Sequence, residues 1–148
     1  MNSQYATPAE VLLVEDNEGD VRLTQEVLSS SRIVNTLHVA RDGLEAQSFL
    51  CNKAPFESAP RPDIILLDLN LPKLDGRELL TWIRANEETK LVPVIVMTTS
   101  REEEDVVSSY TNHANCYIRK PIDLQSLVDV LGQIERFWLQ IVLLPGHR

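Results

Sequence analysis

The stretch that decides the fold is Asp63-Ile64-Ile65-Leu66-Leu67-Asp68-Leu69-Asn70-Leu71-Pro72. Its four consecutive apolar residues predict a strand that is buried on both faces, as in a parallel sheet. The apolar run ends at the carboxylate of Asp68, and open α/β sheets bind ligands at the carboxyl ends of their strands. We therefore expect Asp68 at the mouth of a cleft, with Pro72 and Gly76 turning the chain away behind it.

Other polar residues stand at the ends of strand-like runs in the same way. The acidic pair Glu15-Asp16 follows one apolar run, and Thr98 ends a β-branched run. Lys120 follows a third strand-like run. Because the carboxyl ends of parallel strands share one edge of a sheet, these side chains are expected to face Asp68.

The pattern of strands and helices predicts a doubly wound, five-stranded parallel α/β sheet. The expected strands are 10–14, 35–40, 64–68, 93–98 and 116–119. The expected helices are 18–30, 42–50, 77–86, 100–112 and one that begins after Asp123. Residues 52–62 contain Pro55, Pro60 and Pro62, which predict a loop of open function.

Length and composition fit one domain over residues 1–148, with 43% hydrophobic and 24% charged residues. The formal net charge of −8 opposes binding to nucleic acid or to an anionic membrane. The chain has no signal-peptide pattern and no apolar run of the ~20 residues that span a bilayer. The spacing of Cys51 and Cys116 fits no redox or zinc motif, so we expect reduced thiols and a cytoplasmic protein.

The last expected helix carries two apolar stripes at helical spacing. The first is Leu127, Leu131, Ile134, Trp138 and Ile141, and the second is Val130, Phe137 and Leu144. One stripe is enough to dock the helix on the sheet. The second predicts a homodimer surface formed by Val130, Ile134, Phe137, Trp138, Ile141 and Leu144, unless the tail folds back on its own domain.

The strand-end residues permit one particular chemistry when they are taken together. Like charges ~4 Å apart repel by about 4 kcal/mol at an effective dielectric of ~20, so the three carboxylates favour a cation. Oxygen-only ligands with room for water suit Mg²⁺ or Mn²⁺. A carboxylate can then act as a nucleophile toward a phosphoryl group, which a lysine and a threonine hydroxyl can bind. Each residue taken alone is explained as well by a turn, a cap or the protein surface.

The ordered set of motifs resembles the receiver domain of two-component response regulators over nearly the whole chain. The motifs are Val14-Glu15-Asp16-Asn17, residues 66–72 with Asp75-Gly76, Val96-Met97-Thr98-Thr99 and Tyr117-Ile118-Arg119-Lys120-Pro121. The resemblance implies a flavodoxin-like (βα)5 fold with strand order 2-1-3-4-5, an extended last helix and a short tail. Two departures are Glu15 in place of the commoner Asp, and Thr99 where the family has a small residue.

The resemblance also implies a role for each matching residue. Asp68 would accept the phosphoryl group, Thr98 would hydrogen-bond it and Lys120 would pair with it. Tyr117 would be the aromatic switch that turns inward, although a half-buried strand residue explains it equally well. The Mg²⁺ or Mn²⁺ ligands would be Glu15, Asp16, Asp68 and the backbone carbonyl of Asn70.

A narrower resemblance is to the stand-alone regulators of phytochrome histidine kinases. It is carried by the proline-rich loop, the Asp68 motif, the triplet Thr98-Thr99-Ser100 and the ending from Phe137 to Pro145. It implies a phytochrome-type sensor kinase as partner and a homodimer formed by the C-terminal helix.

We therefore expect a single-domain response regulator that is not an enzyme but catalyses its own phosphorylation and dephosphorylation. Too little chain follows Pro121 for an effector domain, so output would come from protein contact. The main alternative is a pseudo-receiver or adaptor that acts by dimerisation. A haloacid dehalogenase-type phosphatase would need a second Asp at position 70, and a flavodoxin-like nucleotide binder would need a phosphate loop at Glu15-Asp16.

Overall fold

The computed structural model describes residues 8–30, 34–98, 116–119 and 129. Its elements are β1 Ala9–Val14, α1 Glu18–Ser29, β2 Asn35–Ala40, α2 Gly43–Leu50, β3 Ile64–Asp68, α3 Gly76–Ala85, β4 Val94–Thr98 and β5 Cys116–Arg119. They agree with the expected elements to within one residue at most ends. The predicted helix at 100–112 and the body of the last helix lie outside the described residues.

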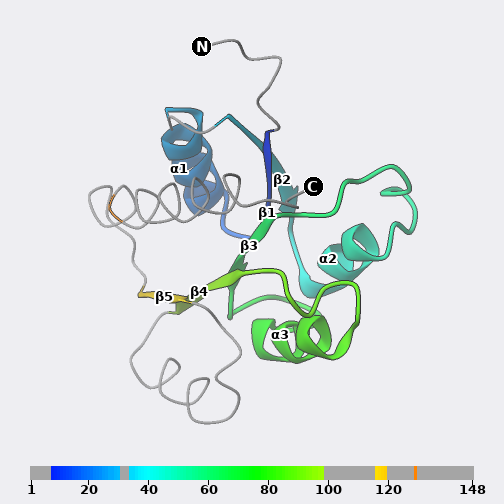
Figure 1. Cartoon of the computed structure of the whole chain (residues 1–148). Coiled ribbons are helices and arrows are strands. Elements are labelled where there is room, and N and C mark those ends of the chain that lie inside the picture. Colours follow the sequence, from blue (N-terminus) through cyan, green and yellow to red (C-terminus); the bar gives the residue numbers. More distant parts are fainter. Residues whose placement is uncertain (1–7, 31–33, 99–115, 120–128, 130–148) are drawn as a thin grey trace.

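The sheet has the strand order β2-β1-β3-β4-β5, and every neighbouring pair is parallel. Figure 1 shows α1 against one face of this sheet and α2 and α3 against the other. The predicted doubly wound α/β fold and its strand order are therefore confirmed for the described strands. In this order β1 and β3 lie side by side, although α1, β2 and α2 separate them in the sequence.

The core has two layers, one on each face of the sheet. Alternate residues of the central strands supply both layers, so all five residues of β3 are buried, as its apolar run predicted. Leu12, Ile65 and Leu67 pack toward α2 and α3. Leu13 and Leu66 pack toward α1.

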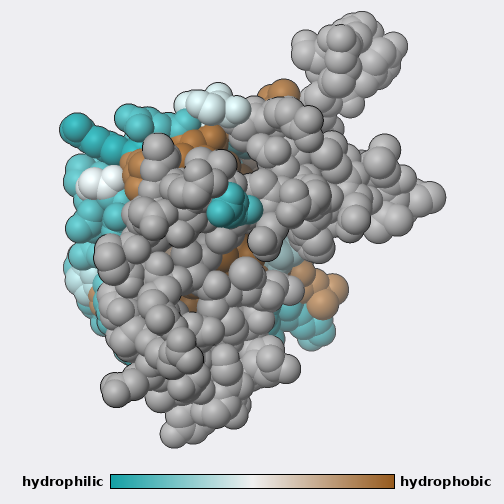
Figure 2. Space-filling view, turned by 90° about the vertical axis from the view of Figure 1, so that its left-hand side faces the viewer, coloured by the Kyte–Doolittle hydropathy of each residue, from teal (hydrophilic) through white to brown (hydrophobic). Residues whose placement is uncertain are grey.

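The surface of the described residues is mainly polar. Among these residues the exposed large hydrophobic side chains are Val34, Leu44 and Leu91. Figure 2 shows hydrophilic residues over much of the described part of the face that it presents. A search of the described helices finds none with the length and apolar character that a membrane span requires.

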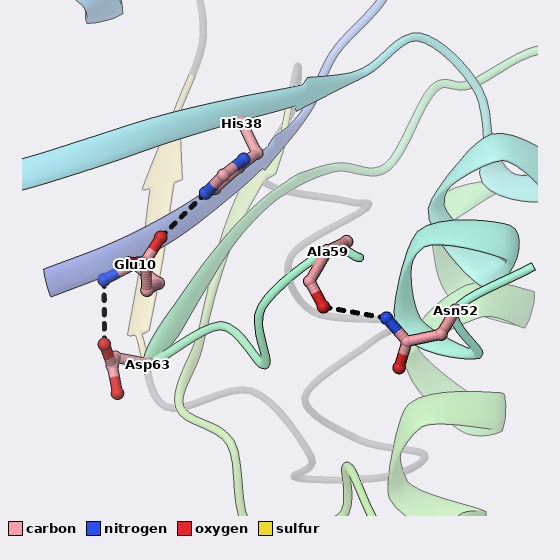
Figure 3. Close-up of polar contacts among 5 residues, drawn as sticks. All are labelled: Glu10, His38, Asn52, Ala59 and Asp63. Atoms are coloured by element: carbon pink, nitrogen blue, oxygen red, sulfur yellow. Dashed lines mark hydrogen bonds and ion pairs between the residues drawn. The ribbon is translucent and has the colours of Figure 1, made fainter. Parts of the chain in front are cut away.

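The amino edge of the sheet is held together by polar contacts (Figure 3). The backbone N–H of Glu10 donates to Oδ2 of Asp63 at 2.7 Å, and Oε1 of Glu10 lies 2.8 Å from Nε2 of His38. Nδ2 of Asn52 donates to the backbone carbonyl of Ala59 at 2.7 Å, which fixes the proline-rich loop beside α2. Residues 51–63 contain neither helix nor strand, as their prolines predicted.

Candidate functional site

The ends of β1 and β3 bring three carboxylates together. Val14 pairs with Leu67 in the sheet register, so Glu15 and Asp16 leave β1 beside Asp68, the last residue of β3. Each of the three side chains has a carboxylate oxygen within 4.8 Å of those of the other two. The predicted acidic cluster is therefore present at the carboxyl edge of the sheet.

Burial differs sharply among the three carboxylates. Glu15 is 0% exposed and Asp68 is 3% exposed, whereas Asp16 is exposed to solvent. A buried carboxylate needs hydrogen-bond donors. The backbone N–H of Asn17 donates to Oε2 of Glu15 at 3.1 Å, and that of Asn70 donates to Oδ1 of Asp68 at 3.1 Å. These bonds orient the two buried groups while Asp16 keeps the cluster open to water.

Asn17 is a further site residue, and its position after the acidic pair was the only indication of it in the sequence. Its side chain caps α1 by accepting a hydrogen bond from the backbone N–H of Asp20 at 2.9 Å, while its own N–H holds Glu15. Asn is a preferred N-cap residue, and Glu18 and Asp20 in the first turn suit the helix dipole. One residue thus starts α1 and orients a carboxylate of the cluster.

Gly76 determines how closely α3 approaches Asp68. A Cβ atom on Gly76 would lie 2.4 Å from the carbonyl oxygen of Asp68 and 2.5 Å from Cα of Leu69. The Gly76 N–H donates to the carbonyl of Leu69 at 2.9 Å, which closes the β3–α3 loop on itself. Only glycine fits here, so the loop that follows Asp68 has a tightly defined path.

The same loop also contacts the start of α2. Nζ of Lys73 lies 3.4 Å from Oδ2 of Asp42, and Lys73 has a left-handed backbone with φ of 68°. A Cβ atom on Gly43 would lie 2.1 Å from the carbonyl oxygen of Leu74, so the backbones meet directly. Nothing in the sequence pattern indicated that the β2–α2 junction would take part in shaping the site.

The cluster fits a hard divalent cation. Its ligand atoms are carboxylate oxygens, which Mg²⁺ and Mn²⁺ prefer, and it lacks the sulfur and imidazole ligands typical of zinc. Three carboxylates within 4.8 Å of one another also repel, so a cation would relieve an existing electrostatic cost. The exposure of Asp16 leaves room for the water ligands that Mg²⁺ retains.

The remaining predicted site residues are described only in part. Asn70 is exposed and directly follows the cluster, and the backbone of Thr98 ends β4 one residue beyond the partner of Asp68. The backbone of Tyr117 lies in β5. The side chains of Thr98 and Tyr117, and all of Lys120, lie outside the described residues. So does the predicted dimer surface of Val130, Ile134, Phe137, Trp138, Ile141 and Leu144.

Comparison with known proteins identifies the class. The family model described as the response regulator receiver domain matches residues 11–132, so the chain belongs to the receiver family. The parallel sheet order and the acidic cluster at its carboxyl edge agree with this membership. The chain is a receiver and not a conventional enzyme.

Particular relatives narrow the comparison to phytochrome response regulators. Response regulator Rcp1 of a Synechocystis species is 49% identical over 146 residues, which cover 99% of each chain. The crystal structure of the Mn²⁺-bound form of Rcp1 matches with a TM-score of 0.80 and 50% identity, over 94% of this chain and 100% of that one. The phosphorylated cyanobacterial phytochrome response regulator RcpA matches with a TM-score of 0.79 and 45% identity, over 90% of this chain and 95% of that one.

Proposed function

We propose that this chain is a response regulator that accepts a phosphoryl group on Asp68 from a sensor histidine kinase of the phytochrome type. The observation that carries the proposal is the cluster of Glu15, Asp16 and Asp68 at the carboxyl edge of the sheet. In this proposal residues 1–148 form a single receiver domain with an extended C-terminal helix and a short tail. The protein works in the cytoplasm and signals by protein contact.

Glu15, Asp16, Asp68 and the backbone carbonyl of Asn70 are the proposed ligands of Mg²⁺, with Mn²⁺ as a substitute. When bound, the cation would offset the repulsion among the carboxylates and neutralise phosphoryl oxygens. The crystal structure of Rcp1 supports this choice, since it is that of the Mn²⁺-bound form. The burial of Glu15 supports a role for it as an outer, water-mediated ligand.

Asp68 is the nucleophile in the proposed reaction. One carboxylate oxygen forms a bond to phosphorus as the bond from phosphorus to the donor's imidazole nitrogen breaks, and that nitrogen keeps the electron pair and is protonated from water. The backbone N–H of Asn70 donates to Oδ1 of Asp68 and so orients the nucleophilic carboxylate. Hydrolysis of the acyl phosphate by water returns the aspartate and inorganic phosphate, so the chain catalyses its own phosphorylation and dephosphorylation.

Thr98, Lys120 and Tyr117 are proposed to convert phosphorylation into a change of surface. The Thr98 hydroxyl would donate to a phosphoryl oxygen, Lys120 would pair with another, and Tyr117 would turn inward. The register supports this, because Thr98 of β4 pairs with Arg119 of β5, the residue before Lys120. Coupling between sites of this kind is typically about 1–3 kcal/mol, which shifts a population of conformers.

The proposed partners are a phytochrome-type histidine kinase and a second copy of this chain. The kinase is supported by the relatives, since RcpA is described as a phytochrome response regulator. The homodimer is supported by the second apolar stripe of the C-terminal helix, and its surface is Val130, Ile134, Phe137, Trp138, Ile141 and Leu144.

Intact-mass analysis after incubation with acetyl phosphate tests the proposal. The wild-type chain is expected to gain one phosphoryl group when Mg²⁺ is present and none when it is chelated. Asp68→Asn is expected to gain none, while Asp75→Asn, which keeps a capping oxygen for α3, is expected to behave as wild type. An Asp68→Asn protein that still gains the group would refute Asp68 as acceptor, and a wild type that never gains it would favour a pseudo-receiver.

A further inference from the structure

The β2–α2 junction, residues 41–43, supplies no carboxylate to the acidic cluster but contacts α1 and the β3–α3 loop, which follow the strand ends that do. Arg41 forms an ion pair with Glu18 in the first turn of α1. The neighbouring Asp42 pairs with Lys73 of the β3–α3 loop at 3.4 Å. The junction therefore links the first turn of α1 to the loop after Asp68.

Asp42 is well placed to act as a fixed anchor. Its Oδ1 caps α2 by accepting a hydrogen bond from the backbone N–H of Glu45 at 2.7 Å. Its side chain is only 13% exposed, whereas that of Lys73 is 64% exposed. The cap immobilises the carboxylate, so its second oxygen presents a negative charge to Lys73 at a defined position.

Lys73 requires such an anchor because of its backbone. Its φ of 68° lies in the left-handed region, which residues other than glycine adopt only at a cost in free energy. The pair with Asp42 favours this conformation. The direct approach of Gly43 to the carbonyl of Leu74 leaves the next residue no room to shift toward α2.

The path of this loop determines where Asn70 and Asp68 point. The loop is closed at its ends by the Gly76 N–H···O contact with Leu69, at 2.9 Å. Between these ends Leu71 is buried in the core, and the more exposed part of the loop contacts the β2–α2 junction at Lys73 and Leu74. If the Asp42–Lys73 pair were lost, Lys73 could relax toward a negative φ and carry the Asn70 backbone with it.

We infer that Asp42 and Lys73 are positioning residues for the cation site, acting through the β3–α3 loop rather than by contact with the ion. This inference rests on the proposed function, because it concerns the same cation. It also assigns a role to the β2–α2 junction, which lies beside the site but contributes no ligand.

Titration with Mn²⁺ alone, followed by electron paramagnetic resonance, distinguishes positioning from simple electrostatics. Asp42→Asn keeps a capping oxygen but removes the charge, and Lys73→Gln removes the opposite charge. Charge alone would make Asp42→Asn bind Mn²⁺ more weakly and Lys73→Gln more tightly. Positioning makes both variants bind more weakly, by about threefold each, which is the scale of a partly exposed ion pair.

The double variant and a conservative variant complete the test. Asp42→Asn with Lys73→Gln is expected to lose about threefold in total, because either change already breaks the same pair. Lys73→Arg is expected to bind as wild type. Matched controls are Glu87→Gln and Lys90→Gln, which break an ion pair of 2.9 Å near the amino end of β4 and should leave Mn²⁺ affinity unchanged.

Two outcomes would overturn the inference, and they are distinguishable. A wild type that binds Mn²⁺ while Lys73→Gln binds it equally or more tightly would refute positioning and leave the proposed function intact. A wild type that binds no Mn²⁺ would overturn the proposed cation site and the inference together.

Discussion

At the amino edge of the sheet the carboxylate of Glu10 lies 2.8 Å from the His38 ring, whereas at the carboxyl edge the carboxylate of Asp68 lies among other carboxylates. The strands β1 and β3 contribute to both edges. Asp63, just before β3, accepts the Glu10 N–H at 2.7 Å, so at this edge the acidic groups lie against donors (Figure 3).

The difference shows where the fold uses charge for stability and where it uses charge for function. At the amino edge, acidic groups that face hydrogen-bond donors hold loops and strand ends together. Like charges gathered at the carboxyl edge carry an electrostatic cost that a bound cation would relieve. Changes at the amino edge should therefore alter folding without altering cation binding, and loss of a carboxylate at the carboxyl edge should weaken cation binding without destabilising the fold.

Gly76→Ala should break this separation most strongly, because the glycine serves both folding and the site. The added Cβ would meet the Asp68 carbonyl oxygen at 2.4 Å, and backbone atoms can give way only by moving the loop. We expect the free energy of unfolding to fall by about 2–3 kcal/mol, measured by urea denaturation. Gly19→Ala is the control: its Cβ would meet only the Asn17 side chain, at 3.3 Å, and should change stability by less than about 1 kcal/mol. Equal effects at the two glycines would contradict this account.

Arg84→Met should affect folding alone, because Arg84 lies where α3 leads into β4. Its Nη1 donates to the carbonyls of Lys90 at 3.0 Å and Val92 at 2.7 Å, and burial lowers the pKa of the guanidinium from its ordinary value. Loss of these charged hydrogen bonds is expected to cost about 2 kcal/mol in urea denaturation, with Mn²⁺ affinity unchanged. Arg77→Met, which breaks only a longer ion pair of 3.9 Å with Asp75 among the contacts described, serves as the control, and a comparable loss there would refute the assignment.

Asp16→Asn, at the carboxyl edge, should weaken cation binding without destabilising the fold. The exposed carboxylate is expected to contribute at least tenfold to Mn²⁺ affinity, about 1.4 kcal/mol, because it is a charged ligand open to solvent. Without a cation the variant should be more stable than wild type by about 0.5–1 kcal/mol, since one repulsive charge is gone. Thermal unfolding with and without Mn²⁺ measures both effects. A variant that is less stable without the ion would show that the cluster is not strained.

Glu10→Gln should give the smallest effect, confined to the amino edge. It removes the charge that faces His38, and the two side chains are 18% and 24% exposed. We expect a loss of about 0.5 kcal/mol in the free energy of unfolding and no change in Mn²⁺ affinity. The backbone N–H contact with Asp63 is retained in this variant. A loss of several kcal/mol would therefore contradict the small contribution expected from the charge that faces His38.

The fold could be predicted because burial leaves a clear mark on the sequence. The apolar run before Asp68 indicated a strand buried on both faces, and Glu15-Asp16 marked the end of a neighbouring strand. The acidic cluster followed from the rule that parallel strands end at one edge. To predict which strand ends lie together, only the strand order was needed in addition. The family resemblance implied that order, and the structure confirms it.

The contacts around the cluster could not be predicted, because they depend on loop geometry. A left-handed lysine at position 73 has no sequence signature, and its pairing with Asp42 joins loops that are distant in the chain. The second bond made by Asn17, to Glu15, likewise depends on how the β1–α1 turn folds. The roles of Thr98, Lys120 and Tyr117 remain predictions from the resemblance, since their side chains lie outside the described residues.

Chemical mapping of the phosphoryl group tests whether Asp68 is the acceptor. The chain is incubated with acetyl phosphate and Mg²⁺ and then with borohydride, which reduces an aspartyl phosphate to homoserine, and the peptides are sequenced by mass spectrometry. Homoserine is expected at position 68, and none is expected when Mg²⁺ is chelated. Homoserine at position 16, the longer alcohol 5-hydroxynorvaline at position 15, or a phosphoryl group on His38 at the opposite edge would refute Asp68 as the acceptor.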